Sequence, residues 1–168
     1  MVSNRIQVAM GEGVVASAPG VVLSSGLGSC VAAILYDRQR KIGGLAHIML
    51  PDSSQLQSEQ SEIRNPKSAF KCADTAIAVL LERLRNRGAV RRDIVAKMVG
   101  GARMFSWYED SNPGIGEQNI TSIRRILRRE QIVLIGEDTG GHHGRSVEFH
   151  LDSGRVIVTA IGQEEKEI

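Results

Sequence analysis

A cysteine and a histidine at hairpin spacing are the residues of this chain best suited to chemistry. Cys30 follows the glycine-containing segment 26–29, and His47 lies in the next apolar run. An imidazole beside a thiol can hold it as the thiolate, and the imidazolium can then protonate a departing nitrogen. The pair is the minimal apparatus for nucleophilic acyl transfer, so it predicts an enzyme.

The segments around the pair predict a β-hairpin. Residues 30–36 and 42–50 are β-rich runs separated by the polar residues 37–40. If 37–40 form the loop, Tyr36 faces Lys41 and Cys30 lies directly opposite His47, with Cβ atoms about 4.5–5.5 Å apart. A slip of one residue would send the two side chains to opposite faces, so the pairing depends on the register.

The residues before the cysteine predict an oxyanion site. Backbone N–H groups of Gly28, Ser29 and Cys30 can point at a developing negative charge, and glycine allows a substrate to approach the backbone closely. The alternative interpretation is structural, because a small cysteine and a histidine in apolar strands are often packed core residues.

Composition indicates one ordinary globular domain. The 168 residues are 42% hydrophobic and 24% charged, with a net charge of +2 that does not favour a nucleic-acid partner. We expect no secretory signal and no membrane insertion, because no sufficiently long apolar run is present. Two cysteines do not make a disulfide scaffold, so we expect a cytoplasmic protein with reduced thiols.

Periodicity predicts a single α/β domain with mostly antiparallel strands and two main helices. The helices are expected over residues 69–87 and from about Asn119 onward. We assign residues 1–162 to the domain and residues 163–168 to a charged tail that frays. The strands are expected at residues 5–10, 21–23, 30–36, 42–50, 94–99, 132–135, 147–151 and 156–161.

Other candidate residues favour structural roles. His142, His143 and His150, with Cys72 and Asp138, match no closed zinc pattern, so we expect no metal site and no cofactor. Cys72 lies beside the apolar stripe of the first helix and is interpreted as a packing residue. Three aromatic residues near the glycines at 100–101 are open to two interpretations, core or partner surface: Phe105, Trp107 and Tyr108.

Several blocks of the chain resemble the chemoreceptor glutamine deamidases, the CheD family. They are Leu-Gly-Ser-Cys-Val-Ala at 27–32, Lys-Ile-Gly-Gly at 41–44, His-Ile-Met-Leu-Pro at 47–51, Ala-Asp-Thr-Ala at 73–76, Gly-Gly-Ala-Arg-Met-Phe at 100–105, Ile-Gly at 115–116 with Asn119, Glu-Asp-Thr-Gly-Gly at 137–141, and Gly-Arg at 144–145. The blocks span nearly the whole chain. The family match also makes residues 100–103 a candidate wall of the active site.

The resemblance implies a protein-glutamine glutaminase, a hydrolase with Cys30 as nucleophile and His47 as its base. Its implied substrates are glutamines of methyl-accepting chemotaxis receptors. It also implies a single-domain α/β sandwich, similar in fold to the catalytic domain of the cytotoxic necrotizing factor toxins, and a CheC-type phosphatase as partner. We expect a monomer when the protein is alone.

Two positions depart from the family pattern. Ser24 stands where the third catalytic residue is commonly a threonine, and Gln118 stands where an arginine is usual. A serine keeps the hydroxyl that orients the histidine but lacks the β-branch that stiffens χ1, so we expect looser orientation. The alternative functions are a non-catalytic adaptor for a CheC-type phosphatase and another Cys-His acyl-transfer enzyme.

Overall fold

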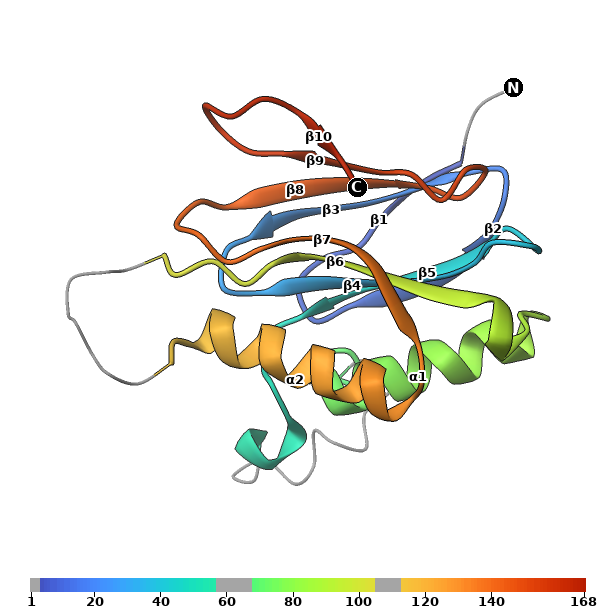
Figure 1. Ribbon diagram of the computed structural model, residues 1–168, viewed down its shortest axis with the longest axis horizontal. Helices are drawn as coiled ribbons and strands as arrows, with labels where there is room; N and C mark the ends of the chain where they lie inside the picture. Colours follow the sequence, from blue (N-terminus) through green and yellow to red (C-terminus); the bar gives the residue numbers. More distant parts are fainter. Residues whose placement is uncertain (1–3, 57–67, 105–112) are drawn as a thin grey trace.

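The protein is built in three layers, two sheets packed face to face and a layer of helices (Figure 1). The computed structural model describes residues 4–56, 68–104 and 113–168. The first sheet has the order β1 (Arg5–Gln7), β3 (Val21–Leu27), β8 (Arg145–His150), β9 (Val156–Thr159), β10 (Lys166–Glu167). The second has the order β2 (Gly13–Ser17), β5 (Ile42–Ile48), β4 (Val31–Asp37), β6 (Ile94–Gly100), β7 (Val133–Thr139). Helices α1 (Ala73–Asn86) and α2 (Ile115–Arg129) cover the outer face of the second sheet, and short 3-10 turns occupy Ser53–Leu56 and Arg91–Asp93.

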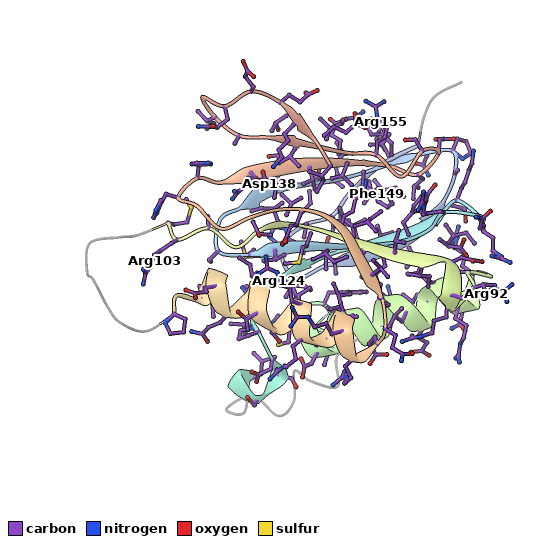
Figure 2. All side chains as sticks on the ribbon, in the orientation of Figure 1. Arg92, Arg103, Arg124, Asp138, Phe149 and Arg155 are labelled. Atoms are coloured by element: carbon purple, nitrogen blue, oxygen red, sulfur yellow. The ribbon has the colours of Figure 1, made fainter. Side chains whose placement is uncertain are left out.

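Strand β4 consists of apolar and aromatic residues up to its last residue, Asp37, because both of its faces are buried. Val31, Ala33 and Leu35 pack toward the helices, whereas the alternate residues of the strand pack toward the first sheet. Phe149 of β8 fills that second layer, where Figure 2 labels it, and meets Tyr36 edge to face at 5.5 Å between ring centroids. Cys30, which immediately precedes β4, therefore also lies in the layer between the two sheets.

The hairpin of β4 and β5 is confirmed, but its predicted register is wrong by two residues. His47 pairs with Ala32 rather than with Cys30. The reason is Asp37, which ends β4 instead of belonging to the loop: its carboxylate accepts the backbone N–H groups of Gln39 and Arg40, both at 3.0 Å. Since side chains alternate with a period of two, a shift of two residues keeps His47 on the face that points into the layer between the sheets, where Cys30 also lies.

Helix α2 begins before the predicted position near Asn119. Gly114 precedes its first residue, Ile115. A Cβ on Gly116 would lie 2.6 Å from the carbonyl oxygen of Gly101, so only glycine lets the first turn approach this loop so closely. Helix α1 begins later than predicted, at Ala73, because the preceding residues form backbone bonds with Leu50.

The fold class is confirmed, and two further differences from the predicted elements are present. Strand β2 was not anticipated, and it pairs with β5 along its whole length. The tail at residues 163–168 was expected to fray, but its residues Lys166 and Glu167 form β10 and pair with β9. Phe105, Trp107 and Tyr108 lie outside the described residues. Neither α1 nor α2 is long and apolar enough to cross a bilayer.

Asp37→Asn is expected to weaken the hairpin that carries His47. Burial raises the pKa of Asp37, but N–H donors from Val90, Arg40 and Gln39 and the Arg40 guanidinium outweigh it and hold the pKa below its ordinary value. Replacing an acceptor oxygen by an amide leaves buried donors unsatisfied, at about 1–3 kcal/mol in the free energy of unfolding. Because the folded-state pKa is depressed, the difference from wild type should shrink as pH falls below about 4.

Urea unfolding across this pH range measures the effect. The control is Asp93→Asn, which removes the partly exposed salt bridge of Arg40 with Asp93 (2.8 Å) and should cost less than about 1 kcal/mol. Equal losses in the two variants would contradict the role given to Asp37.

Gly100→Ala is expected to disturb the start of β4. Gly100 has φ +116°, and a Cβ there would overlap the carbonyl oxygen of Cys30. Gly88 also has a positive φ, +101°, but a Cβ would meet nothing within 4 Å. Gly88→Ala therefore isolates backbone strain, about 1 kcal/mol in unfolding free energy, and Gly100→Ala should exceed it by about 1–3 kcal/mol. Similar values from urea titrations would refute the close approach at Gly100.

Candidate active site

Cys30 is held in a loop that leads from the first sheet into the second. The loop is tied to the segment after β6 by two backbone bonds of 2.8 Å, from Gly101 N–H to the Cys30 carbonyl and from Ala102 N–H to the Gly28 carbonyl. The thiol residue is 8% exposed and belongs to the apolar layer between the sheets. Residues 100–103 therefore do lie beside the cysteine, and Arg103 projects from the end of the molecule at which this loop turns (Figure 2).

His47 and Ser24 meet across the two sheets. His47 lies on β5 and Ser24 on β3, and the Ser24 hydroxyl oxygen is 2.9 Å from His47 Nδ1. The same hydroxyl is 2.9 Å from the carbonyl oxygen of Val8. Both side chains are buried, with 1% exposure each. This is a hydroxyl–imidazole contact enclosed in a largely apolar layer.

These two contacts determine the tautomer of His47. The Ser24 hydroxyl has one hydrogen, and the Val8 carbonyl can only accept. Both contacts are hydrogen bonds only if the serine donates to Val8 and His47 Nδ1 donates to the serine. In neutral His47 the lone pair then lies on Nε2, which is buried and has no hydrogen-bond partner among the described residues.

Burial favours the uncharged forms of both Cys30 and His47. Desolvation raises the pKa of the Cys30 thiol, and a hydrogen bond from the residue's own backbone N–H partly opposes this rise. Desolvation lowers the pKa of His47. The resting pair at neutral pH is therefore a thiol and a neutral imidazole. Its Nε2 atom can accept a proton, which is the role of a general base.

The three predicted oxyanion donors differ in their backbone contacts. The Gly28 N–H donates to the Gly26 carbonyl at 3.0 Å, so it is already occupied. No backbone carbonyl of the described residues accepts the N–H of Ser29 or Cys30. Gly28 instead provides space, because a Cβ there would lie 3.1 Å from Met104 Cγ. The Cys30 N–H instead interacts with the sulfur of its own residue, so the N–H groups of Ser29 and Cys30 are the candidate donors for an oxyanion that forms beside that sulfur.

Asn119 is a site residue that the sequence reasoning missed. It is fully buried on α2, and its amide Nδ2 donates to the carbonyls of Ser29 and Met49, each at 3.0 Å. Ser29 immediately precedes Cys30, and Met49 lies two residues after His47. The available signal was an asparagine placed within the apolar stripe of a helix, next to Ile120 and one turn before Ile123.

The remaining candidates have structural explanations. Cys72 is fully buried at the start of α1, and burial, Asp74 and Asp52 raise the pKa of its thiol to about 11, which suits a packing residue. Asp138 accepts from Arg145 Nε at 3.1 Å and from Lys166 Nζ at 3.3 Å. His142 contacts the Arg103 carbonyl. Within the described ranges, no three His, Cys, Asp or Glu side chains cluster in a way that could hold a metal ion.

Comparison with known proteins gives a consistent family. The family model described as CheD chemotactic sensory transduction matches residues 49–160. A protein of Moorella thermoacetica named probable chemoreceptor glutamine deamidase CheD is 44% identical over 167 residues, which cover 98% of this chain and 96% of the relative. The chemoreceptor glutamine deamidase CheD of Halalkalibacterium halodurans is 40% identical over 167 residues, 99% of each chain.

A third relative extends the match over the full length. The probable chemoreceptor glutamine deamidase CheD of Caldanaerobacter subterraneus subsp. tengcongensis is 38% identical over 169 residues, covering 100% of both chains. The similarity therefore includes the segments that carry Ser24, Cys30 and His47 as well as the region matched by the family model. The chain belongs to the CheD family.

Proposed function

We propose that this protein is a chemoreceptor glutamine deamidase that converts glutamine side chains of methyl-accepting chemotaxis receptors to glutamate and releases ammonia. One observation carries the proposal: the Ser24–His47 hydrogen bond leaves an unprotonated Nε2 on a histidine that faces the layer between the sheets, where Cys30 also lies. The names of the relatives supply the substrate class. The catalytic group is Cys30 as nucleophile, His47 as general base and acid, and Ser24 as the residue that orients the imidazole.

Acylation begins from the neutral pair. Cys30 Sγ attacks the carbon of the substrate carboxamide while its proton passes to His47 Nε2. The carboxamide oxygen becomes an oxyanion, which the N–H groups of Ser29 and Cys30 stabilise. The imidazolium returns its proton to the nitrogen as the C–N bond breaks, so ammonia leaves and a thioester remains on Cys30.

Hydrolysis of the thioester completes the reaction. His47 Nε2 removes a proton from water as the water oxygen attacks the acyl carbon. The C–S bond breaks, the sulfur recovers a proton from the imidazolium, and the product is a glutamate side chain. Ser24 maintains the imidazole orientation throughout, because its hydroxyl can accept from Nδ1 in both the neutral and the charged ring.

The proposed setting is the cytoplasm, where the receptor helices that carry the glutamines are accessible. The proposal includes a CheC-type phosphatase as partner and a monomeric state for the deamidase alone. The similarity to a chemotaxis family supports this setting.

Substitution of the three site residues should produce graded losses. Cys30→Ala should abolish conversion of receptor glutamines, because no other group can form the thioester. Ser24→Ala should lower kcat by on the order of 10²-fold, less than loss of the nucleophile, since the imidazole would lose only its orienting partner. Incubation with a receptor cytoplasmic fragment, followed by peptide mass spectrometry for amide-to-acid conversion, measures both effects.

Two control variants accompany this series. Ser25→Ala alters the exposed neighbour of Ser24 and should leave kcat unchanged. Ser24→Thr keeps the hydroxyl and should retain activity. Conversion by Cys30→Ala at the wild-type rate would refute the proposed mechanism, and a folded wild-type protein that converts no receptor glutamine would favour the adaptor function.

The pH dependence of thiol alkylation tests the neutral resting pair. Because burial raises the pKa of Cys30, the thiolate fraction should grow only as pH rises past the ordinary thiol value of about 8.5. Iodoacetamide modification of Cys30, followed by mass spectrometry, should therefore accelerate with pH through this range. His47→Ala should slow the reaction at neutral pH, because the base that accepts the thiol proton is gone.

Cys72 serves as an internal reference in the same experiment, because it is fully buried and its pKa is raised to about 11. A Cys30 rate that has already reached its plateau at neutral pH would indicate a resting thiolate–imidazolium pair and contradict the prediction. A Cys30 as unreactive as Cys72 at every pH would contradict a catalytic thiol.

A further inference from the structure

Asn119 joins the two backbone segments that carry the proposed catalytic residues. One donor of its amide goes to the carbonyl of Ser29, immediately before Cys30, and the other goes to the carbonyl of Met49, just beyond β5 and His47. Both contacts are 3.0 Å, and the side chain is fully buried. An amide nitrogen has two hydrogens, so these bonds use its whole donor capacity and fix the orientation of the group.

The bond to Ser29 also determines the direction of the Cys30 N–H. The Ser29 carbonyl and the Cys30 N–H belong to one planar trans peptide unit, in which they point in opposite directions. A carbonyl held toward α2 therefore turns this N–H away from α2. The same N–H is directed at the sulfur of its own residue, where it lowers the pKa of the Cys30 thiol. A side chain on α2 thus aims a donor at the reacting atom.

The amide is not fully satisfied by these contacts. Its oxygen, Oδ1, is buried and has no hydrogen-bond partner among the described residues. A buried acceptor without a partner weakens the folded state. The pattern fits a residue whose two donor bonds hold the loop of Cys30 and the end of the His47 strand, rather than one that serves only the packing of α2.

Resting on the proposed deamidase function, we propose that Asn119 is a positioning residue for the reaction. By holding the Ser29–Cys30 peptide, it keeps the Cys30 N–H aimed at the thiolate and at the oxyanion that forms beside it. Its second bond, to Met49, holds the end of the His47 strand against the same helix. The amide does not touch substrate and acts through the backbone of these two segments.

Ser122 offers a matched control on the same helix. Its hydroxyl is also buried, and it donates to the backbone carbonyl of Pro51 at 2.5 Å. Ser122→Ala therefore removes a buried bond from α2 to a backbone carbonyl without altering the peptide before Cys30. The two variants differ in which carbonyl is released.

The experiment measures kcat and KM for receptor-fragment deamidation, the Cys30 thiol pKa from the pH profile of alkylation, and the stability to urea. Asn119→Ala should lower kcat by about 10–100-fold with little change in KM, because a transition-state donor loses its alignment. It should also raise the Cys30 thiol pKa. Ser122→Ala should lower stability while leaving kcat and the thiol pKa as in wild type.

An unchanged kcat and thiol pKa in a folded Asn119→Ala protein would overturn the proposal, as would equal changes in Ser122→Ala. If Asn119→Ala does not fold, Asn119→Ser takes its place, because its hydroxyl can bond within its own helix. A wild-type protein without deamidase activity would refute the proposed function separately. In that case the thiol pKa alone would still decide whether Asn119 aims the Cys30 N–H.

Discussion

The hydrogen bond between Ser24 and His47 is the interaction on which the rest of the site depends. It connects the two sheets through their apolar layer and gives His47 a defined tautomer. A hydroxyl without a β-branch was expected to orient the ring loosely. In the structure the Val8 carbonyl supplies the missing restraint, because it takes the hydroxyl hydrogen and so holds the Ser24 oxygen toward Nδ1. The Val8 carbonyl thus restrains the Ser24 side chain, as the γ-methyl group of a threonine would.

The constraint on Cys30 is of a different kind, because it comes from close backbone packing. Glycines at positions 100, 101 and 116 let the segment after β6 and the first turn of α2 approach the loop that carries the thiol. The result is a thiol and an imidazole that burial keeps neutral until a substrate arrives. In the proposed mechanism, such a pair keeps the Cys30 thiol protonated at rest, and the thiol becomes a nucleophile by proton transfer to Nε2.

Much of this arrangement could be predicted from the sequence, because it depends on local periodicity. The hairpin and the placement of Cys30 and His47 in one layer follow from alternating strands, and this placement survives a register error of two residues. The register itself could not be predicted, since it depends on an Asp37 carboxylate that closes the turn from the end of a strand. The early start of α2 and the occupied N–H of Gly28 likewise depend on tertiary packing. Asn119 was overlooked because its partners, Ser29 and Met49, are distant in sequence.

The tautomer of His47 tests the account most directly. Nitrogen-15 NMR of the imidazole in the wild-type protein at neutral pH distinguishes a ring with its hydrogen on Nδ1 from one with its hydrogen on Nε2. We expect a neutral ring with hydrogen on Nδ1 and a free lone pair on Nε2, as the bond to Ser24 requires. A hydrogen on Nε2, either in the other neutral tautomer or in a resting imidazolium, would contradict it.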